Sequence, residues 1–333
     1  MTLVFLIRII TFNIITVILV NTVKKRITLR KTTTEVNTDV NSMDEASCSP
    51  HHELRQPRLI MMSDTPIARP YILRPEQIEQ FQQLGYAHLP NVLTEDEICQ
   101  IEYSYDRFMR NEVPGMGQDF CDMSGPYDRK FQDFALINAM LPRLYMPSLQ
   151  GNVFETVSAA IAAQLIGDDI LLDYDQFLAK KPHRPDAQFA WHQDQGYWPV
   201  GTPDTRTVTC SLAIDDSLQP NGCLRCVPGS GATRSLRSHR SPTGNRDAGH
   251  TLEADVSSKE TIEYLEVRRG GITVHDEWIV HGSSGNCTEN WRRTYVIAYR
   301  SRATVEHERS IGFTHSHNDD INWTTQLGAY AKP

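Results

Sequence analysis

The stretch WHQDQGYWP (191–199) places a histidine and an aspartate two positions apart among aromatic side chains, directly after the turn-prone run KKPHRPDAQ. On an extended backbone the residues i and i+2 point to the same side, so His192 and Asp194 can direct an imidazole nitrogen and a carboxylate oxygen at one point. Gln193 points to the opposite side, where it can hydrogen-bond the surrounding frame. The stretch therefore predicts a β-strand that carries part of a metal site.

Short runs rich in β-branched and aromatic residues, separated by Gly, Pro and Asn, fill the chain from residue 170 onward. Six of them predict strands: ILLDYDQFLAKK, RTVTCSLAIDD, GCLRCVPGSG, TIEYLEVRRGG, ITVHDEWIV and RRTYVIAYR. Before them we expect a helix between Pro75 and Gly85, a strand over 86–93, and a second helix after the capping box TEDE (94–97). The predicted fold is mainly β with flanking helices (α+β), a jelly roll or double-stranded barrel with helices packed outside.

The composition narrows the class of protein. With 333 residues, 40% hydrophobic and 22% charged, the chain has enough apolar material for a sizeable core. The formal net charge of −8 argues against binding to nucleic acid. Seven cysteines without a framework spacing are typical of reduced thiols, which predicts an intracellular, cytoplasmic protein. We interpret Cys223 and Cys226, a CxxC without a second pair, as buried strand positions.

The first sixty residues differ from the rest. The run LVFLIRIITFNIITVILV (3–20) is apolar over about one membrane thickness, and basic residues follow it up to residue 31. Residues 1–31 have four open interpretations: a membrane anchor, an organellar presequence, a cleaved signal, or a mistaken start upstream of Met61 or Met62. The polar stretch 32–58 predicts a disordered spacer. Contact with a membrane is expected through the N-terminal segment alone.

One globular domain is predicted over residues 61–333. Within it, the polar stretch 230–260 is too long and too charged for an ordinary hairpin, so we expect a lid or insertion over one end of the barrel. The segment 303–333 contains His315 and His317 but no recognisable metal motif. Its expected place is the mouth of the barrel.

A second histidine from a distant strand would complete a 2-His-1-carboxylate set, which binds Fe(II) on one face and leaves three positions for water, co-substrate and O₂. His281, at the end of an apolar run, is the candidate. Arg292 follows it across a turn containing Gly285 and Asn286, and a guanidinium binds a carboxylate bidentately. Because Arg293 must point to the other face of the same strand, we expect it to face solvent.

An alternative metal set combines His275 and Glu277, an HxE pair, with His281. If all three residues lie on one strand, the separations of four and six residues correspond to about 13–20 Å, which is too far for one ion. On this assumption we exclude the set.

Together these residues resemble the phytanoyl-CoA dioxygenase family of Fe(II)/2-oxoglutarate oxygenases, over roughly residues 70–300. The resemblance rests on the order and spacing of His192-Gln193-Asp194 with Tyr197 and Trp198-Pro199, Asn221-Gly222-Cys223-Leu224 with Pro228-Gly229-Ser230, and His281-Gly282-Ser283 with Asn286 and Arg292. It implies a double-stranded β-helix core of the cupin-like kind. It also implies iron held by His192, Asp194 and His281, and a distal 2-oxoglutarate carboxylate held by Arg292 with help from Ser283.

Further contacts to the co-substrate are expected. Lys130, in RKFQDF, resembles a family position near 2-oxoglutarate. Tyr174, Gln176 and Lys180 share one face of a strand that leads to the site, which makes them candidates for contacts to the co-substrate or the ligands. We interpret Trp191 and Trp198 as core side chains, with a screen against water as the alternative role of the aromatic residues.

Three positions depart from the family pattern. Ser211 stands where tryptophan is common, Gly231 replaces the histidine of PGSH, and Gly270-Gly271 replaces a GD pair. These changes leave the metal set intact and alter the expected wall around the substrate. Phytanoyl-CoA is therefore not carried over as the substrate.

The predicted function is a 2-oxoglutarate-dependent dioxygenase that hydroxylates a small apolar or amphipathic molecule and converts 2-oxoglutarate to succinate and CO₂. The expected cofactors are Fe(II), 2-oxoglutarate and O₂, with ascorbate as an optional reductant. The carboxylate at Asp194 argues against halogenation, whereas desaturation would use the same centre. The alternative from another class is a metal-binding jelly-roll protein that binds or senses a ligand without oxidising it.

Overall fold

The structure is a computed structural model that describes residues 71–199, 201–242 and 249–319. The apolar segment, the spacer and the domain boundary predicted near residue 60 lie outside the described residues. Of the helices in the described ranges, none combines the length and the apolar character needed to cross a bilayer.

Two antiparallel sheets and a set of helices make up the described chain. The helices are α2 (Pro75–Leu84), α3 (Glu95–Met109), α4 (Pro142–Tyr145), α5 (Val153–Ile166) and α6 (Arg302–Ser310), with short 3-10 turns η1 (Gly117–Asp119), η2 (Phe131–Asp133), η3 (Pro147–Leu149), η4 (Asp194–Tyr197) and η5 (Gln219–Asn221). The strands are β1 (Tyr86–Leu89), β2 (Phe120–Asp122), β3 (Leu136–Met140), β4 (Ile170–Lys180), β5 (Phe189–His192), β6 (Thr207–Ala213), β7 (Leu224–Cys226), β8 (His239–Arg240), β9 (Glu253–Ala254), β10 (Glu263–Leu265), β11 (Ile272–His275), β12 (His281–Ser283) and β13 (Arg292–Ser301).

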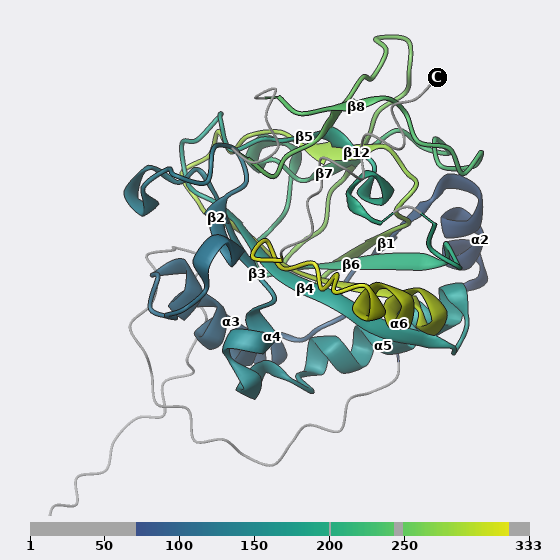
Figure 1. Ribbon diagram of the computed structural model, residues 1–333, viewed down its shortest axis with the longest axis horizontal. Coiled ribbons are helices and arrows are strands. Elements are labelled where there is room, and N and C mark those ends of the chain that lie inside the picture. Colours follow the sequence, from purple (N-terminus) through teal and green to yellow (C-terminus); the bar gives the residue numbers. More distant parts are fainter. Residues whose placement is uncertain (1–70, 200, 243–248, 320–333) are drawn as a thin grey trace, which may run out of the picture. The chain divides into compact units, whose positions relative to one another are not determined.

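The strands form a sandwich. The large sheet has the order β1-β11-β6-β13-β4-β3-β2, the small sheet has the order β10-β7-β12-β5, and β8 pairs with β9. In Figure 1, α3 and α5 lie on one side of the large sheet, and β5, β7 and β12 lie on the other. This arrangement confirms the predicted mainly β jelly roll with helices packed outside.

Local sequence signals explain the N-terminal elements. Pro75 opens α2, and Gly85, which follows the helix, has φ 81°, a left-handed conformation that favours glycine. Thr94 caps α3 by accepting from the backbone N–H of Glu97, whose carboxylate accepts the N–H of Thr94 in return. Both predicted helices are therefore confirmed. Helix α5 was not among the elements that the sequence patterns predicted.

Alternation along the strands gives the large sheet two chemically different faces. The outer face is apolar and packs against the helices, through residues that include Val208, Cys210, Leu212, Ile297, Tyr295, Phe177 and Val274. The inner face, toward the small sheet, carries smaller or polar residues such as Thr209, Ser211 and Thr273. The hydrophobic core thus lies between the large sheet and the helices.

Three residues on the inner face of the large sheet are partly exposed. Gln176 and Leu178 on β4, and Ser211 on β6, are half-buried although their strands are central in the sheet. A residue on a central strand reaches solvent when the opposite layer does not cover it. Ser211, where the family commonly has tryptophan, therefore leaves room inside the barrel.

The run ITVHDEWIV forms a strand and a turn, and the single strand predicted there was wrong. Strand β11 ends at His275, and His281 begins β12 in the other sheet. Residues 276–280 carry the chain from one sheet to the other, with Asp276 accepting the N–H of Trp278. Because of this turn, distances calculated along one extended strand do not apply to His275 and His281.

Arg293 points away from the barrel interior, as alternation predicts, but the expectation that it faces solvent was wrong. Helix α3 covers that face, so the guanidinium is 2% exposed. It pairs with Asp215 at 2.8 Å, Asp106 at 2.6 Å and Glu102 at 2.5 Å. These three carboxylates raise the pKa of Arg293 against the opposing effect of burial.

Removal of this cation should destabilise the fold. We expect Arg293→Ala to lower the free energy of unfolding by about 3–5 kcal/mol, because buried carboxylates lose their common partner. Arg268, whose side chain is 72% exposed beside Asp216, provides the control, and Arg268→Ala should change it by less than about 1 kcal/mol. Urea unfolding followed by circular dichroism measures both, and equal effects would contradict the structural assignment.

Asp175 is an acid in the apolar layer. It lies on the outer face of β4, is 2% exposed and accepts a hydrogen bond from the hydroxyl of Tyr295 at 3.1 Å. Burial raises its pKa to about 7, although the positive charge of Arg143 opposes this rise. The folded protein thus holds this proton more tightly than the unfolded chain does, so the contribution to stability is present below about pH 4 and is lost as the pH rises through about 7.

We expect Asp175→Asn to stabilise the protein at pH 8, by up to about 4 kcal/mol, and to have little effect at pH 4. The comparison of thermal unfolding midpoints between pH 4 and pH 8 measures this difference. Asp128→Asn, at an exposed loop position, serves as the control. A pH dependence that survives in Asp175→Asn would contradict the prediction.

Candidate metal and co-substrate site

The pairing of β5 with β12 brings together three of the predicted residues. His192 and His281 are direct partners in the register of these strands. Asp194 follows at the start of η4, and its Oδ1 lies 3.2 Å from Nε2 of His192 and 3.4 Å from Nε2 of His281. All three side chains are buried. The sequence separation of 89 residues thus corresponds to adjacent strands.

Backbone hydrogen bonds orient both imidazole rings. Nδ1 of His192 lies 2.7 Å from the carbonyl oxygen of Ala190, and Nδ1 of His281 lies 3.0 Å from that of Ile279. Because a carbonyl only accepts, each Nδ1 carries a proton and each Nε2 presents a lone pair toward Asp194. This tautomer suits metal coordination, with the backbone carbonyl in the supporting position.

The electrostatics of the set also suit a divalent ion. Burial alone would raise the pKa of Asp194, but His281, His192 and His275 lower it well below its usual value. Burial lowers the pKa of His192, whereas Asp194 raises the pKa of His281 against the effect of burial. The set can therefore offer one carboxylate and two imidazole nitrogens, the donors of a 2-His-1-carboxylate iron site.

His275 and Glu277, the excluded HxE pair, have different partners. Nε2 of His275 lies 3.3 Å from Oδ2 of Asp194, whereas His192 and His281 lie nearest to Oδ1. Burial lowers the pKa of His275. Glu277 turns to Arg300, with Oε1 2.9 Å from Nε. Glu277 is therefore engaged elsewhere, although the distance argument used against the pair assumed one continuous strand and was wrong.

A cationic subsite lies next to the three residues. Lys180 and Arg292 are partners in the register of β4 and β13, so both side chains project from the inner face of the large sheet. Nζ of Lys180 donates to Oγ of Ser283 at 2.7 Å and to the carbonyl of Ser284. Nε of Arg292 donates to Oγ of Ser217 at 3.2 Å. Each of the two buried cations thus bonds a different serine hydroxyl, and neither forms an ion pair with a carboxylate among the described residues.

Burial and the neighbouring cations shift the pKa of Lys180. Burial, followed by the charges of Arg292 and Arg225, lowers the pKa of Lys180 well below its usual value. Burial also lowers the pKa of Arg292. An anion placed between the two side chains would relieve this repulsion, because opposite charges favour the protonated forms.

The turns at Gly222 and Asn286 position the residues of this subsite. Gly222 has φ 79°, and a Cβ there would lie 2.2 Å from the carbonyl oxygen of Ser284 and 3.0 Å from Nζ of Lys180. Asn286 is buried and uses its side chain to bond Asn290 and Thr288, which fixes the turn before Arg292. Both residues belong to the frame that positions Lys180 and Arg292.

The remaining predicted contacts lie in different places. Gln176 projects from the inner face of β4 between Lys180 and Tyr174, and its partner across β13 is Val296. Lys130 is exposed and precedes η2, on the loop between β2 and β3. Of the two lysines, the structure places Lys180 beside Arg292. The sequence contains a signal for this choice, since Lys180 ends the strand that carries Tyr174 and Gln176.

Gln193 anchors the predicted insertion, as the alternation suggested. Its side chain donates to the carbonyls of Ser235 and Trp278 and accepts the N–H of Arg237. Nε2 of His239 lies 3.1 Å from the backbone nitrogen of Gln193. Gly231 also lies in this region, and a Cβ there would approach the backbone of Trp278 to 2.9 Å, so the close approach favours glycine where the family has histidine.

The two aromatic residues after Asp194 have different roles: Trp198 belongs to a core cluster, and Tyr197 contacts the segment around residue 250. Trp198 is buried and packs with Tyr174, Leu252 and Phe313, which confirms its interpretation as a core residue. Trp191 is half-buried instead, with the guanidinium of Arg225 over its ring. The hydroxyl of Tyr197 accepts the N–H of Leu252 at 2.8 Å, and its ring stacks on His250. These contacts fasten the segment around residue 250 to the loop that carries Asp194.

The described part of the C-terminal segment lies against the same region. His317 stacks on His250 with ring centroids 3.9 Å apart, and Asp119 accepts hydrogen bonds from Ser316 and from the N–H of His317. His315 packs edge-on against Trp198. Residues 313–319 thus pack beside Tyr197 and Trp198.

A second cluster of metal-binding residue types is an ion-pair network. Asp173, Glu308 and His315 converge in the interior, with His315 Nε2 2.7 Å from Asp173. Arg300 and Arg309 already neutralise these carboxylates. The charge of Asp173 raises the pKa of His315 against the effect of burial. Arginine side chains thus already balance the negative charge of this cluster.

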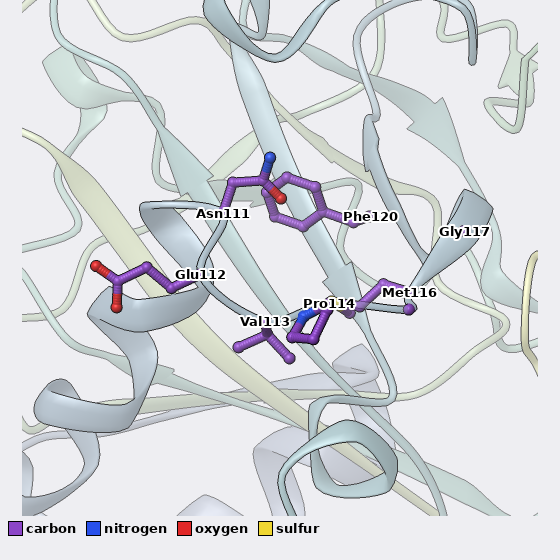
Figure 2. A pocket seen from close by; sticks show the side chains of 8 residues that line it. Asn111, Glu112, Val113, Pro114, Met116, Gly117 and Phe120 are labelled. Atoms are coloured by element: carbon purple, nitrogen blue, oxygen red, sulfur yellow. The ribbon is translucent and has the colours of Figure 1, made fainter.

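A surface pocket of about 330 Å³ lies apart from these residues. It is lined by the loop from Asn111 to Gly117 together with Phe120, as Figure 2 shows. Its acidic residue, Glu112, pairs with Arg110 at 2.7 Å. Since the loop supplies no converging set of titratable groups, the pocket is not a candidate catalytic site.

Comparison with known proteins agrees with this geometry. Residues 81–294 match the family described as phytanoyl-CoA dioxygenase. The chain is 25% identical over 241 residues to ectoine dioxygenase of Stutzerimonas stutzeri (strain A1501), covering 67% of this chain and 76% of the relative. Among solved structures, EvdO2 from Micromonospora carbonacea var. aurantiaca is 25% identical with a TM-score of 0.57, covering 71% of this chain and 94% of EvdO2. Its complex with 2-oxoglutarate superposes with a TM-score of 0.56 at 23% identity, with the same shares covered.

Proposed function

Because the chain belongs to the phytanoyl-CoA dioxygenase family and is a 2-oxoglutarate-dependent dioxygenase that uses Fe(II), we propose that His192, Asp194 and His281 hold its iron. The observation that supports this assignment is the convergence of Nε2 of His192, Nε2 of His281 and Oδ1 of Asp194 from β5, η4 and β12. When bound, the iron supplies the O₂ chemistry that oxidises the substrate and releases succinate and CO₂ from 2-oxoglutarate. The protein positions the reactants and keeps the site dry.

We assign the distal carboxylate of 2-oxoglutarate to Lys180, Arg292 and Ser283. His281 and Ser283 are two residues apart on β12 and point to the same side, about 6.5 Å from each other on an extended strand. A five-carbon diacid can bridge this separation, with its keto-acid end near His281 and its distal end at Ser283. Lys180, which already donates to Ser283, and Arg292 beside it supply the positive charge.

Gln176 extends this assignment along β4. It lies two residues from Leu178 on the inner face and is half-buried, so its amide can reach the open interior between the sheets. There we propose that it contacts the co-substrate. Lys130 remains a predicted co-substrate contact as well, although its exposed position on the β2–β3 loop supports this less directly than the position of Lys180 does.

The substrate is proposed to be a small apolar or amphipathic molecule that undergoes hydroxylation. The half-buried residues of the inner face, Gln176, Leu178 and Ser211, are neutral and combine amide, aliphatic and hydroxyl surface. This lining favours a neutral molecule with few polar groups. Incubation of metabolite extracts with the protein under ¹⁸O₂, compared with an Arg292→Met variant, would identify the product by its mass shift.

The assignment of Asp194 predicts the loss of co-substrate turnover. The protein, supplied with Fe(II), 2-oxoglutarate, O₂ and ascorbate, should form succinate slowly even without substrate. Asp194→Ala removes the anionic ligand and should reduce succinate to the background of the reaction mixture, measured by mass spectrometry.

Cys287→Ser provides the control, because Cys287 is exposed and lies outside the site. It should form succinate at the rate of the unchanged protein. Succinate formation by Asp194→Ala at that same rate would overturn the proposed ligand set.

The assignment of Lys180 predicts weaker binding of the co-substrate. Lys180→Met removes a charge-assisted hydrogen bond, so the KM for 2-oxoglutarate should rise by about 10–100-fold. The neighbouring Lys181 points to the other side, with its ammonium near the carbonyl of Phe131, and Lys181→Met should leave the KM unchanged. Succinate assays over a range of 2-oxoglutarate concentrations measure both variants, and equal KM values would contradict the assignment.

A further inference from the structure

We propose that His275 is the positioning residue of the metal centre, donating a hydrogen bond from Nε2 to Oδ2 of Asp194 so that Oδ1 faces the metal. This inference rests on the proposed ligand set and adds a residue that belongs to neither sequence motif of that set. Its basis is the division of the carboxylate oxygens: Oδ1 lies near His192 and His281, and Oδ2 lies 3.3 Å from His275.

The tautomers separate His275 from the two ligand histidines. Nδ1 of His192 and Nδ1 of His281 donate to backbone carbonyls, so in the neutral ring each Nε2 is unprotonated and can bind a metal. Nδ1 of His275 is buried and has no hydrogen-bond partner among the described residues. Only a protonated Nε2 can bond the ionised Asp194, because a carboxylate accepts and does not donate. A nitrogen that carries a proton has no lone pair for a metal.

The location of His275 makes it a rigid support. It is 3% exposed, and its backbone pairs with Tyr86 on one side and Thr209 on the other, inside the large sheet. Asp194 lies at the start of a short 3-10 turn, outside any strand. The hydrogen bond therefore fixes the carboxylate, which begins a turn, to a strand that is held along both edges. Such support of a metal ligand commonly affects metal affinity by about 10–100-fold.

The competing assignment makes His275 a third imidazole ligand. Its ring lies close to that of His281, with centroids 4.4 Å apart, so proximity alone does not exclude coordination. The two assignments differ in what a substitute side chain must supply. A positioning residue needs a hydrogen-bond donor, whereas a ligand needs a lone pair directed at the metal.

The test uses two substitutions of similar volume in the metal-free, full-length protein. His275→Gln keeps an N–H donor, and His275→Leu does not. We expect His275→Leu to bind Co(II) about 10–100-fold more weakly in calorimetric titration, and His275→Gln to recover most of the affinity. His88→Gln, on β1 of the same sheet, is the matched control and should bind as the unchanged protein does.

Proton NMR of the Co(II) protein supplies a second readout, because each coordinated imidazole contributes one strongly shifted, exchangeable N–H signal. We expect two such signals in the unchanged protein and in both His275 variants. Three signals, one of them lost in the variants, would overturn the proposal by making His275 a ligand. Unchanged Co(II) affinity in His275→Leu would overturn it by removing the positioning role.

Failure of the underlying ligand set would look different. His192→Ala and His281→Ala should each abolish one shifted N–H signal. If both signals persist in these variants, the ligand set itself is wrong, whatever His275 does. Should His275→Leu not fold, as judged from its thermal unfolding, His275→Gln decides the question: two signals and near-normal affinity support the positioning role, and one lost signal contradicts it.

Discussion

The antiparallel pairing of β5 with β12 is the constraint on which the site depends. It sets His192 opposite His281, two residues separated by 89 positions in sequence, and it leaves Asp194 at the point where β5 ends. A slip of one residue in this register would turn every side chain of the strand to the other face and separate the two imidazoles. The backbone carbonyls of Ala190 and Ile279 then fix the rings, so strand geometry determines both position and tautomer.

The large sheet contributes to the same centre through its inner face. Its outer face builds the hydrophobic core with the helices, and this core holds the strands in place without filling the barrel. The inner face is therefore available for Lys180, Arg292 and His275, residues whose burial would destabilise an ordinary core. The outer face also contains two buried ionisable groups, Arg293, which pairs with Asp215, and Asp175, which accepts a hydrogen bond from Tyr295. One face of the sheet thus builds the hydrophobic core, and the other carries the residues of the proposed site.

Alternation and spacing predicted much of this arrangement. The positions i and i+2 place His192 and Asp194 together, and the same rule gives Gln193 its role as an anchor of the segment around residue 235. Local patterns do not show which element packs against each face of a strand. Arg293 was expected in solvent because the sequence does not reveal that α3 covers its strand. The turn at 276–280 was not predicted because HDEWI contains no glycine or proline. Without that turn, the approach of His275 to Asp194 could not be predicted either.

The two sheets hold different parts of the proposed site, so their relative position matters more than either sheet alone. His192 and His281 belong to the small sheet, whereas Lys180, Arg292 and His275 belong to the large one. Hydrogen bonds connect these parts, from Lys180 to Ser283 on β12 and between His275 and Asp194, which follows β5. A shift of one sheet against the other would disturb the metal ligands and the diacid subsite together. In the proposed site, these polar contacts across the barrel therefore fix the distance between the metal-binding residues and the diacid subsite.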